Sequence, residues 1–182
     1  MLLVVAATER ELAAVRAAET FVCGVGPVDA AIATTRRLAD GDVTAVVHVG
    51  IAGARTLEPL TLVLGSEAVY CDVVDASSSF PRVERVAPDA ALLAAVRAAL
   101  PDARVEPIGT SGRLGGSTGC DVEAMEGFGV LRAAALADVP AVELRAISNA
   151  IGEPDRAKWR FDDAFAAIGD AVTRLVPELA HA

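Results

Sequence analysis

Several polar residues follow apolar segments of the chain, where their side chains could act together on a small molecule. Glu9 and Glu11 come directly after the apolar N-terminal segment, and Glu123 and Glu126 lie three residues apart in the second half of the chain. Arg145 lies within a further apolar segment. A carboxylate at a strand end can activate water or hold a sugar hydroxyl, and a nearby arginine keeps it ionised. Spacing alone is equally compatible with solvated loop charges, so both interpretations stay open at this level.

Other familiar catalytic and cofactor sites are not supported by the sequence. Residues 24–27 (GVGP) resemble the start of a dinucleotide-binding fingerprint, but Asp29 stands where the third glycine should permit close packing. There is no lysine-containing phosphate loop, and the two histidines, His48 and His181, are too few for a histidine-rich metal site. His48 lies in an apolar segment and is expected to be a hydrogen-bonded core residue. We therefore expect neither a metal nor a cofactor.

The segments that must position these residues alternate between short apolar runs and longer Ala-rich stretches of helical period. This alternation is typical of an α/β fold. Strands are expected over residues 2–7, 44–50 and 140–147, with the glycine at the end of the second expected to stop it. Weaker signals predict strands within 60–74 and 103–109.

Proline and glycine mark the expected helix ends. One helix should begin at Pro27 and end before Gly41, and another should begin at Pro88 and be closed by Pro101. Two more are expected over 125–137 and 161–176. Nearly continuous apolar strands indicate a sheet covered on both faces, so we predict a three-layer α/β sandwich with a central mixed sheet and ligands at the strand ends.

The composition indicates a single acidic domain over residues 1–182. Hydrophobic residues make up 53% of the chain, which excludes a disordered protein. Lys and Arg total 16 against 25 Asp and Glu, for a net charge of −9. No basic cluster is present to neutralise phosphates, so a nucleic-acid partner is excluded.

No segment of the sequence indicates export or a membrane. The apolar N-terminus has no basic residue before it, and charge arrives as early as Glu9, unlike a signal peptide. No uninterrupted apolar run reaches the length of about 18 residues that a membrane span needs. The three cysteines form no CxxC pair and are expected to be reduced. We therefore expect a cytoplasmic protein.

Two segments read together resemble the paired signature of the purine nucleoside phosphorylase/nucleosidase superfamily. They are residues 122–127 (VEAMEG) and 142–149 (VELRAISN). Residues 6–12 (AATEREL) are similar to that family's first strand and loop, and residues 49–53 (VGIAG) to its glycine-rich turn. The resemblance extends over nearly the whole chain and implies a nucleoside phosphorylase-like fold.

The resemblance also implies roles for individual residues. Glu11 matches the carboxylate that orients and deprotonates the attacking water, and Arg145 matches the arginine that anchors that water or the carboxylate. Glu126 matches the residue that binds ribose hydroxyls, with Met125 beneath the sugar. Glu123 is left open between substrate contact and a helix-start or packing role. Further substrate contacts are implied for Gly50, Ile51 and Ser148.

Asn149 indicates which base is cleaved. Adenine-cleaving members of the superfamily carry Asp here, which can pass a proton to N7 of the base, whereas an amide can only hydrogen-bond N7 and the O6 atom of a 6-oxopurine. Residues 148–156 (SNAIGEPDR), followed by Trp159, are similar to the futalosine hydrolase branch, whose substrate carries hypoxanthine. Ile51 stands where a hydroxyl residue often helps to hold phosphate, which favours water as the nucleophile.

The sequence thus leads to the expectation of futalosine hydrolysis in menaquinone biosynthesis, without a metal, in a homodimer or larger homo-oligomer. The alternatives are a nucleosidase or phosphorylase for another purine nucleoside, such as inosine or methylthioadenosine, and a nucleoside-binding protein that has lost catalysis. Compared with the family, residues 72–112 form a shortened segment, and the loop 110–116 lacks an aromatic residue to stack on the base. Phe128, Trp159 or Phe161 could supply that face or belong to the core.

Overall fold

A mixed sheet of eight strands forms the centre of the molecule, with helices packed against it. The computed structural model describes residues 1–16, 18–73, 82–114 and 119–179. Within these ranges the elements are, in chain order, β1 (Leu2–Ala6), α1 (Glu9–Leu12), β2 (Glu19–Val22), α2 (Pro27–Leu38), β3 (Ala45–Ala54), β4 (Leu62–Tyr70), β5 (Arg85–Val86), α3 (Ala90–Ala99), β6 (Arg104–Thr110), β7 (Val122–Ala124), α4 (Gly127–Leu136), β8 (Ala141–Ala150), the 3-10 helix η1 (Arg156–Lys158) and α5 (Phe161–Leu179).

Five of the strands close into a ring. β3 pairs in parallel with β8, β8 pairs antiparallel with β4, and β4 and β6 pair in parallel. β6 then pairs in parallel with β7, which returns antiparallel to β3. Small and branched side chains fill the interior of the ring, among them Ala52, Val122 and Ile147. Because side chains alternate along a strand, the residues between these interior positions face outward.

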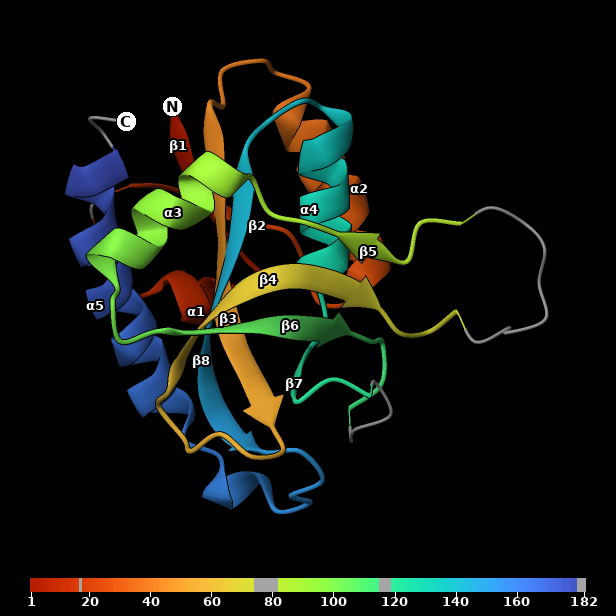
Figure 1. Cartoon of the computed structure of the whole chain (residues 1–182), viewed down its shortest axis with the longest axis vertical. Coiled ribbons are helices and arrows are strands. Elements are labelled where there is room, and N and C mark those ends of the chain that lie inside the picture. The colour runs from red at the N-terminus through yellow and green to blue at the C-terminus, as the bar shows by residue number, and fades with distance from the viewer. Residues whose placement is uncertain (17, 74–81, 115–118, 180–182) are drawn as a thin grey trace.

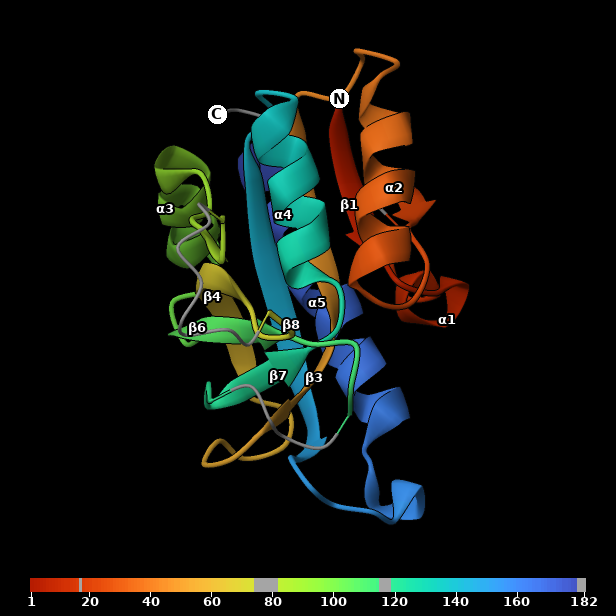
Figure 2. The same cartoon turned by 90° about the vertical axis from the view of Figure 1, so that its right-hand side faces the viewer.

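Helices cover both faces of the sheet, as Figures 1 and 2 show. α1, α3 and α5 pack on one face around Leu12, Val96 and Ile168, whereas α2 and α4 pack on the other around Ala30 and Val130. The predicted three-layer α/β architecture with a mixed central sheet is therefore confirmed. Among the helices in the described ranges, none combines the length with the apolar composition that a bilayer crossing requires.

Several predicted boundaries were wrong, among them the end of the strand expected over 140–147, which continues to Ala150. Gly50 does not end its strand: β3 continues to Ala54 because its backbone stays paired with β8 along its whole length and reaches β7 at its end. The helix expected from Pro88 begins at Ala90, because Asp89 is the N-cap and its carboxylate accepts a hydrogen bond from Leu92 N at 2.8 Å. The short elements α1, β2, β5 and β7 were not anticipated from the sequence.

Replacing the N-cap of α3 should lower stability. Asp89→Ala removes the acceptor for Leu92 N, and loss of such a cap costs about 1 kcal/mol. We expect the free energy of unfolding in urea to fall by about 0.5–2 kcal/mol. Asp102→Ala, which removes an exposed carboxylate after the same helix, is the control and should stay within about 0.5 kcal/mol of the parent. Equal stabilities for the two variants would contradict the capping role.

Candidate functional site

A cavity of about 830 Å³ opens where β1, β3, β7 and β8 end, between α1 and the start of α5. Its volume lies in the range of small-molecule sites, roughly 300–1,000 Å³. Most of the residues singled out in the sequence line it: Glu11, Ile51, Met125, Glu126, Ser148 and Asn149. Glu123, left open above, lies in strand β7 and also lines the cavity, so it does not start a helix.

Glu11 is held rigidly because it belongs to the N-terminal cap of α1. Its Oε2 accepts hydrogen bonds from Thr8 N and Thr8 Oγ1, both at 3.0 Å, and Thr8 Oγ1 in turn caps the Glu11 backbone N–H. Its Oε1 accepts from Ile51 N at 3.3 Å. The hydrogen bonds between Thr8 and Glu11 form a capping box, in which a Thr is followed three residues later by a Glu. The hydrogen bonds that cap the start of α1 therefore also direct the Glu11 carboxylate into the cavity.

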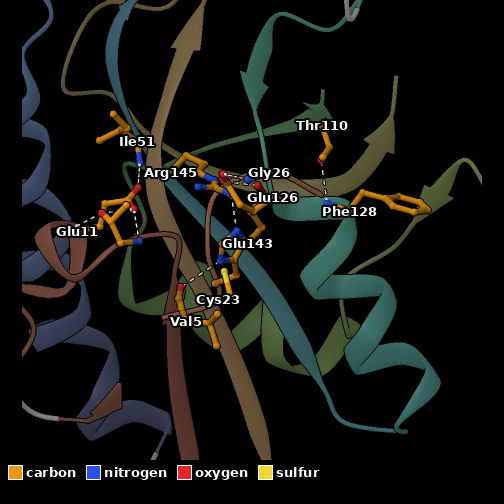
Figure 3. A network of polar contacts seen from close by, with 12 residues as sticks. Val5, Glu11, Cys23, Gly26, Ile51, Thr110, Glu126, Phe128, Glu143 and Arg145 are labelled. Atoms are coloured by element: carbon orange, nitrogen blue, oxygen red, sulfur yellow. Dashed lines mark hydrogen bonds and ion pairs between the residues drawn. The ribbon is translucent and has the colours of Figure 1, made fainter. Parts of the chain in front are cut away.

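Arg145 lies beneath the cavity and is fully buried. Its Nε donates to Glu143 Oε1 at 2.8 Å, and its Nη2 lies 3.7 Å from Glu126 Oε2 (Figure 3). Nη1, by contrast, has no hydrogen-bond partner among the described residues. A methyl group at Gly50 would lie 2.1 Å from Nη1 and 2.8 Å from Glu11 Oε1. Gly50 is not among the residues that line the cavity, and the absence of a side chain there lets the guanidinium approach the Glu11 carboxylate.

His48 completes the buried network and is held neutral. Its Nδ1 lies 3.1 Å from Val5 O, which can only accept, so Nδ1 carries the hydrogen. Its Nε2 contacts Arg145 Nη2, which can only donate, so Nε2 presents its lone pair. Burial, together with the Arg145 charge, lowers the pKa of His48 well below its usual value. The expectation of a hydrogen-bonded core histidine agrees with this geometry.

Negative charge predominates around Arg145. Burial raises the pKa of Glu126 and of Glu143, and the nearby guanidinium opposes that rise at both. Although burial lowers the pKa of Arg145, the carboxylates of Glu143, Glu126 and Glu11 raise it overall. One guanidinium thus faces three carboxylates, an arrangement that stabilises a cationic group bound above them.

Two glycine-containing segments support the carboxylates. Gly26 N, at the start of α2, donates to Glu126 Oε1 at 3.0 Å, so the segment that resembled a dinucleotide fingerprint orients an acidic side chain. At the start of α4, a methyl group on Gly127 would lie 2.2–2.4 Å from the carboxylate atoms of Glu143. Only glycine leaves room for that buried carboxylate.

Asn149 faces the cavity at a bulge between β3 and β8. The pairing passes from Ala52–Ile147 directly to Gly53–Asn149, so Ser148 is the extra residue. Ser148 Oγ donates to Asn149 Oδ1 at 2.7 Å, and Asn149 Nδ2 donates to Ala150 O at 2.9 Å. A carbonyl can only accept, so this orientation of the amide is the consistent one. One N–H of Nδ2 remains to donate to a ligand.

Aromatic side chains form the outer end of the cavity. Trp159, Phe161 and Phe165 line it. The ring centroids of Trp159 and Phe161 are 5.4 Å apart, and those of Phe161 and Phe165 are 6.2 Å apart. Arg10 lies over Phe161 and Phe165, and Arg156 lies over Trp159. Of the three aromatic residues considered from sequence, Phe128 lies elsewhere, stacked on Tyr70.

Sequence reasoning missed several of these groups. Thr8 could have been found from its capping-box spacing to Glu11, and Glu143 from its position two residues before Arg145 on the same side of a strand. The expected shortened segment 72–112 includes residues 74–81, which lie outside the described residues, as do His181 and two glycines of the loop 110–116. The described residues contain no cluster of three or more His, Cys, Asp or Glu able to hold a metal.

Comparison with known proteins identifies the family. The profile of the phosphorylase superfamily matches residues 15–111, just over half of the chain. The chain belongs to the phosphorylase superfamily. A futalosine hydrolase from Streptomyces coelicolor is 57% identical over 61 residues, which are 34% of this chain and 26% of that relative. The matched segment thus spans about a quarter of the relative's length.

Solved structures of the superfamily share the fold. A futalosine hydrolase mutant from Helicobacter pylori superposes with a TM-score of 0.88 at 15% identity, covering 97% of this chain and 98% of that one. A 5′-methylthioadenosine/S-adenosylhomocysteine nucleosidase from S. pneumoniae, with a transition-state inhibitor, gives 0.83 at 18% identity over 98% and 99%. At these sequence identities, the structural similarity establishes that this chain shares their fold.

Neutral His48 makes stability depend on pH. The folded state resists protonation of this imidazole, whereas the unfolded chain takes up the proton near pH 6.5, so its contribution is lost as pH falls below that value. His48→Gln keeps one donor and one acceptor but does not titrate. We expect the stability gap between parent and variant to shrink by about 1.4 kcal/mol per pH unit below 6.5, measured by urea denaturation from pH 7.5 to 5.5.

The raised pKa values of Glu126 and Glu143 make the folded state more stable as pH falls, opposite to the effect of His48. Both carboxylates are present in the parent and in the variant, so their effect cancels in the difference between the two. His181→Gln removes the other histidine and serves as the control. Parallel stability curves for the parent and His48→Gln would show that His48 is not held neutral.

Proposed function

We propose that this protein is a futalosine hydrolase, which cleaves the N-glycosidic bond of futalosine with water and releases hypoxanthine. The orientation of Asn149 carries the proposal: its amide turns an N–H toward the cavity that holds Glu11 and Glu126. An N–H donor matches N7 and O6 of a 6-oxopurine, both of which accept. The segment similarity to the futalosine hydrolase from S. coelicolor supports the same substrate.

The proposed reaction begins with ribose seated over Glu126 and Met125. Glu126 accepts hydrogen bonds from the ribose hydroxyls, and its carboxylate is already oriented by Gly26 N. As the bond between C1′ and the base nitrogen breaks, the base keeps the electron pair and the sugar becomes oxocarbenium-like. The carboxylate-rich surroundings stabilise this cation. Asn149 Nδ2–H stabilises the negative charge that develops on the base until the base takes up a proton from solvent and leaves as hypoxanthine.

Glu11 serves as the general base in this proposal. It takes a proton from water while the water oxygen forms the new bond to C1′. Arg145 Nη1 and Glu11 Oε1 approach the same point beside Gly50, so a water between them would donate to the carboxylate and accept from the guanidinium. Arg145, although fully buried, thus contacts the attacking water through Nη1.

Water is favoured over phosphate as the nucleophile. The backbone N–H of Ile51 donates to Glu11 and its side chain is apolar, so this part of β3 offers little to a phosphate. The carboxylates of Glu11 and Glu126 repel an anion at the same place. The outer aromatic end of the cavity, formed around Trp159 and Phe161, would receive the substituent at the 5′ position of the ribose.

We also propose that the enzyme is a homodimer or larger homo-oligomer in the cytoplasm. Val28 and Ile32, four residues apart in α2, are exposed, as is Val25 just before that helix, and Val25 also lines the cavity. A second copy covering this strip would close the site. The three cysteines are all thiols, in keeping with a reducing compartment.

Glu11→Gln should abolish most of the activity. The amide cannot accept the proton of water, and a general base contributes about 10²–10⁴-fold. Release of base from futalosine, inosine, adenosine and methylthioadenosine should be followed by chromatography, with and without phosphate. We expect hypoxanthine from futalosine without phosphate, and a loss of kcat in the variant. Glu9→Gln, exposed on the same helix, is the control and should be unaffected.

Each other outcome of that assay points to an alternative. Strict dependence on phosphate indicates a phosphorylase, and turnover of inosine or methylthioadenosine in place of futalosine indicates a different nucleosidase. Binding without turnover indicates a nucleoside-binding protein. Any of these contradicts the proposal.

Asn149→Asp should shift the base preference toward 6-aminopurines. A carboxylic acid can pass a proton to N7, whereas an ionised carboxylate repels O6 of hypoxanthine. The ratio of kcat/KM for inosine-type against adenosine-type substrates is expected to fall at least about tenfold, equivalent to the loss of one good hydrogen bond. An unchanged ratio would remove Asn149 from base recognition.

A further inference from the structure

Glu143 is a buried carboxylate that holds Arg145 without reaching the cavity. It is fully buried and is not among the residues that line the cavity. Its Oε1 accepts from Arg145 Nε at 2.8 Å (Figure 3). Two carboxylates that do line the cavity approach the terminal nitrogens: Glu126 Oε2 lies 3.7 Å from Nη2, and Glu11 Oε1 approaches Nη1. The guanidinium is thus shared between one carboxylate outside the cavity and two that line it.

Holding Arg145 in place does not by itself require a carboxylate at position 143. Glu143 Oε2 has no hydrogen-bond partner among the described residues. A methyl group at Gly127 would overlap the carboxylate, and one at Gly65 in β4 would lie 3.6 Å from Oε2, so two glycines leave room for it. An amide oxygen would give Arg145 Nε the same acceptor without burying a charge, which is costly. The buried charge itself therefore calls for an explanation.

The surroundings favour the ionised form of Glu143. Gly127 is the first residue of α4, so the carboxylate lies against the N-terminal turn of a ten-residue helix, where the helix dipole favours negative charge. A proton on Oε2 would be a donor without an acceptor, because that atom has no partner among the described residues. Burial raises the pKa of Glu143, and the charge and hydrogen bond of Arg145 oppose the rise.

The charge of Glu143 is not cancelled by His48 and is felt in the cavity. His48 is the register partner of Glu143 between β3 and β8, and it is neutral. One cation, Arg145, therefore faces three carboxylates, which leaves a net charge of −2. Burial is the main cause that raises the pKa of Glu126, Arg145 opposes it, and the charges of Glu11 and Glu143 add to the rise. Glu143 thus acts on a residue that lines the cavity.

We infer that Glu143 is a positioning residue that makes the cavity selective for a positively charged sugar ring. By balancing the charge of Arg145, it lets the guanidinium hold the attacking water without cancelling the negative field of Glu11 and Glu126. A neutral ribose gains little from this field, whereas an oxocarbenium-like ribose is stabilised by it. This inference rests on the proposed function, because it concerns the cation that forms in that reaction.

Binding of a stable cation tests the inference without requiring turnover. The probe is a hypoxanthine nucleoside analogue whose sugar ring contains a protonated nitrogen, and its comparison is the neutral carbocyclic analogue. Both should be titrated calorimetrically into the parent, Glu143→Gln and the control Thr34→Val. The control removes a hydroxyl that is also buried and has no hydrogen-bond partner among the described residues, but lies in α2 away from Arg145.

Glu143→Gln should weaken binding of the cationic analogue alone. Removing one unit charge roughly 10 Å from the sugar, at an effective dielectric of about 20, corresponds to a loss of about tenfold in affinity. The neutral analogue should bind within about twofold of the parent, because it carries no charge for the field to act on. Thr34→Val should bind both analogues as the parent does.

The kinetic signature separates this role from a purely structural one. Glu143→Gln should lower kcat for futalosine about tenfold with little change in KM, because the charge acts on the transition state and not on the neutral substrate. Gln matches Glu in shape and keeps an oxygen that accepts from Arg145 Nε, so a structural role alone predicts no such split. Glu143→Asp, which keeps the charge, should retain the preference for the cationic analogue.

A second variant covers the case in which Glu143→Gln does not fold. Combining Glu143→Val with Gly127→Ala fills the space of the carboxylate with apolar atoms and removes the same charge. It should also lose about tenfold in affinity for the cationic analogue relative to the neutral one.

The outcomes separate this inference from the proposed function. An unchanged preference for the cation in the folded uncharged variants, an equal loss for both analogues, or no preference in the parent would overturn the role of Glu143. A loss confined to the cationic analogue, in a protein that hydrolyses no nucleoside, would support that role and overturn the proposed hydrolase activity instead.

Discussion

The arrangement of the site depends on one buried cation. Arg145 is fully enclosed, and each hydrogen-bonding edge of its guanidinium has a different neighbour: Glu143 at Nε, His48 and Glu126 at Nη2, and the Gly50 gap at Nη1. Removing one partner of a buried ion pair costs about 3–5 kcal/mol, because the remaining charge stays desolvated. The same group therefore links β8 to β3 through His48 and to the start of α4 through Glu126, and it sets the charge that the cavity presents to a ligand.

Closure of the strands into a ring brings distant segments of the chain together at the cavity. β3 contacts both β7 and β8, so residues from three separate parts of the chain share a row across Gly53. The bulge at Ser148 turns the next side chain outward at the level of that row. The ring interior, filled by small and branched side chains, fixes the outward direction of the polar residues.

Much of the fold was predictable from sequence because the long strands are apolar and the helices are marked by proline and glycine. β7 was missed because it has three residues, too few for a period to show. Gly50 was read as a strand end because glycine usually weakens strands, yet here its missing side chain admits a guanidinium from a strand far along the chain. Glu143 sits inside an apolar run; its spacing to Arg145 places both on one side of a strand, but the strength of their pairing comes from burial, which the spacing does not report.

Gly127 and Glu143 together constrain how the sequence can change. A methyl group at position 127 would overlap the Glu143 carboxylate, so an alanine there is compatible only with a smaller or apolar residue at 143. The two positions are 16 residues apart and should vary together among proteins that share this site. The residues at 127 and 143 would therefore indicate, from sequence alone, whether a protein with this site pairs its buried arginine with a buried carboxylate.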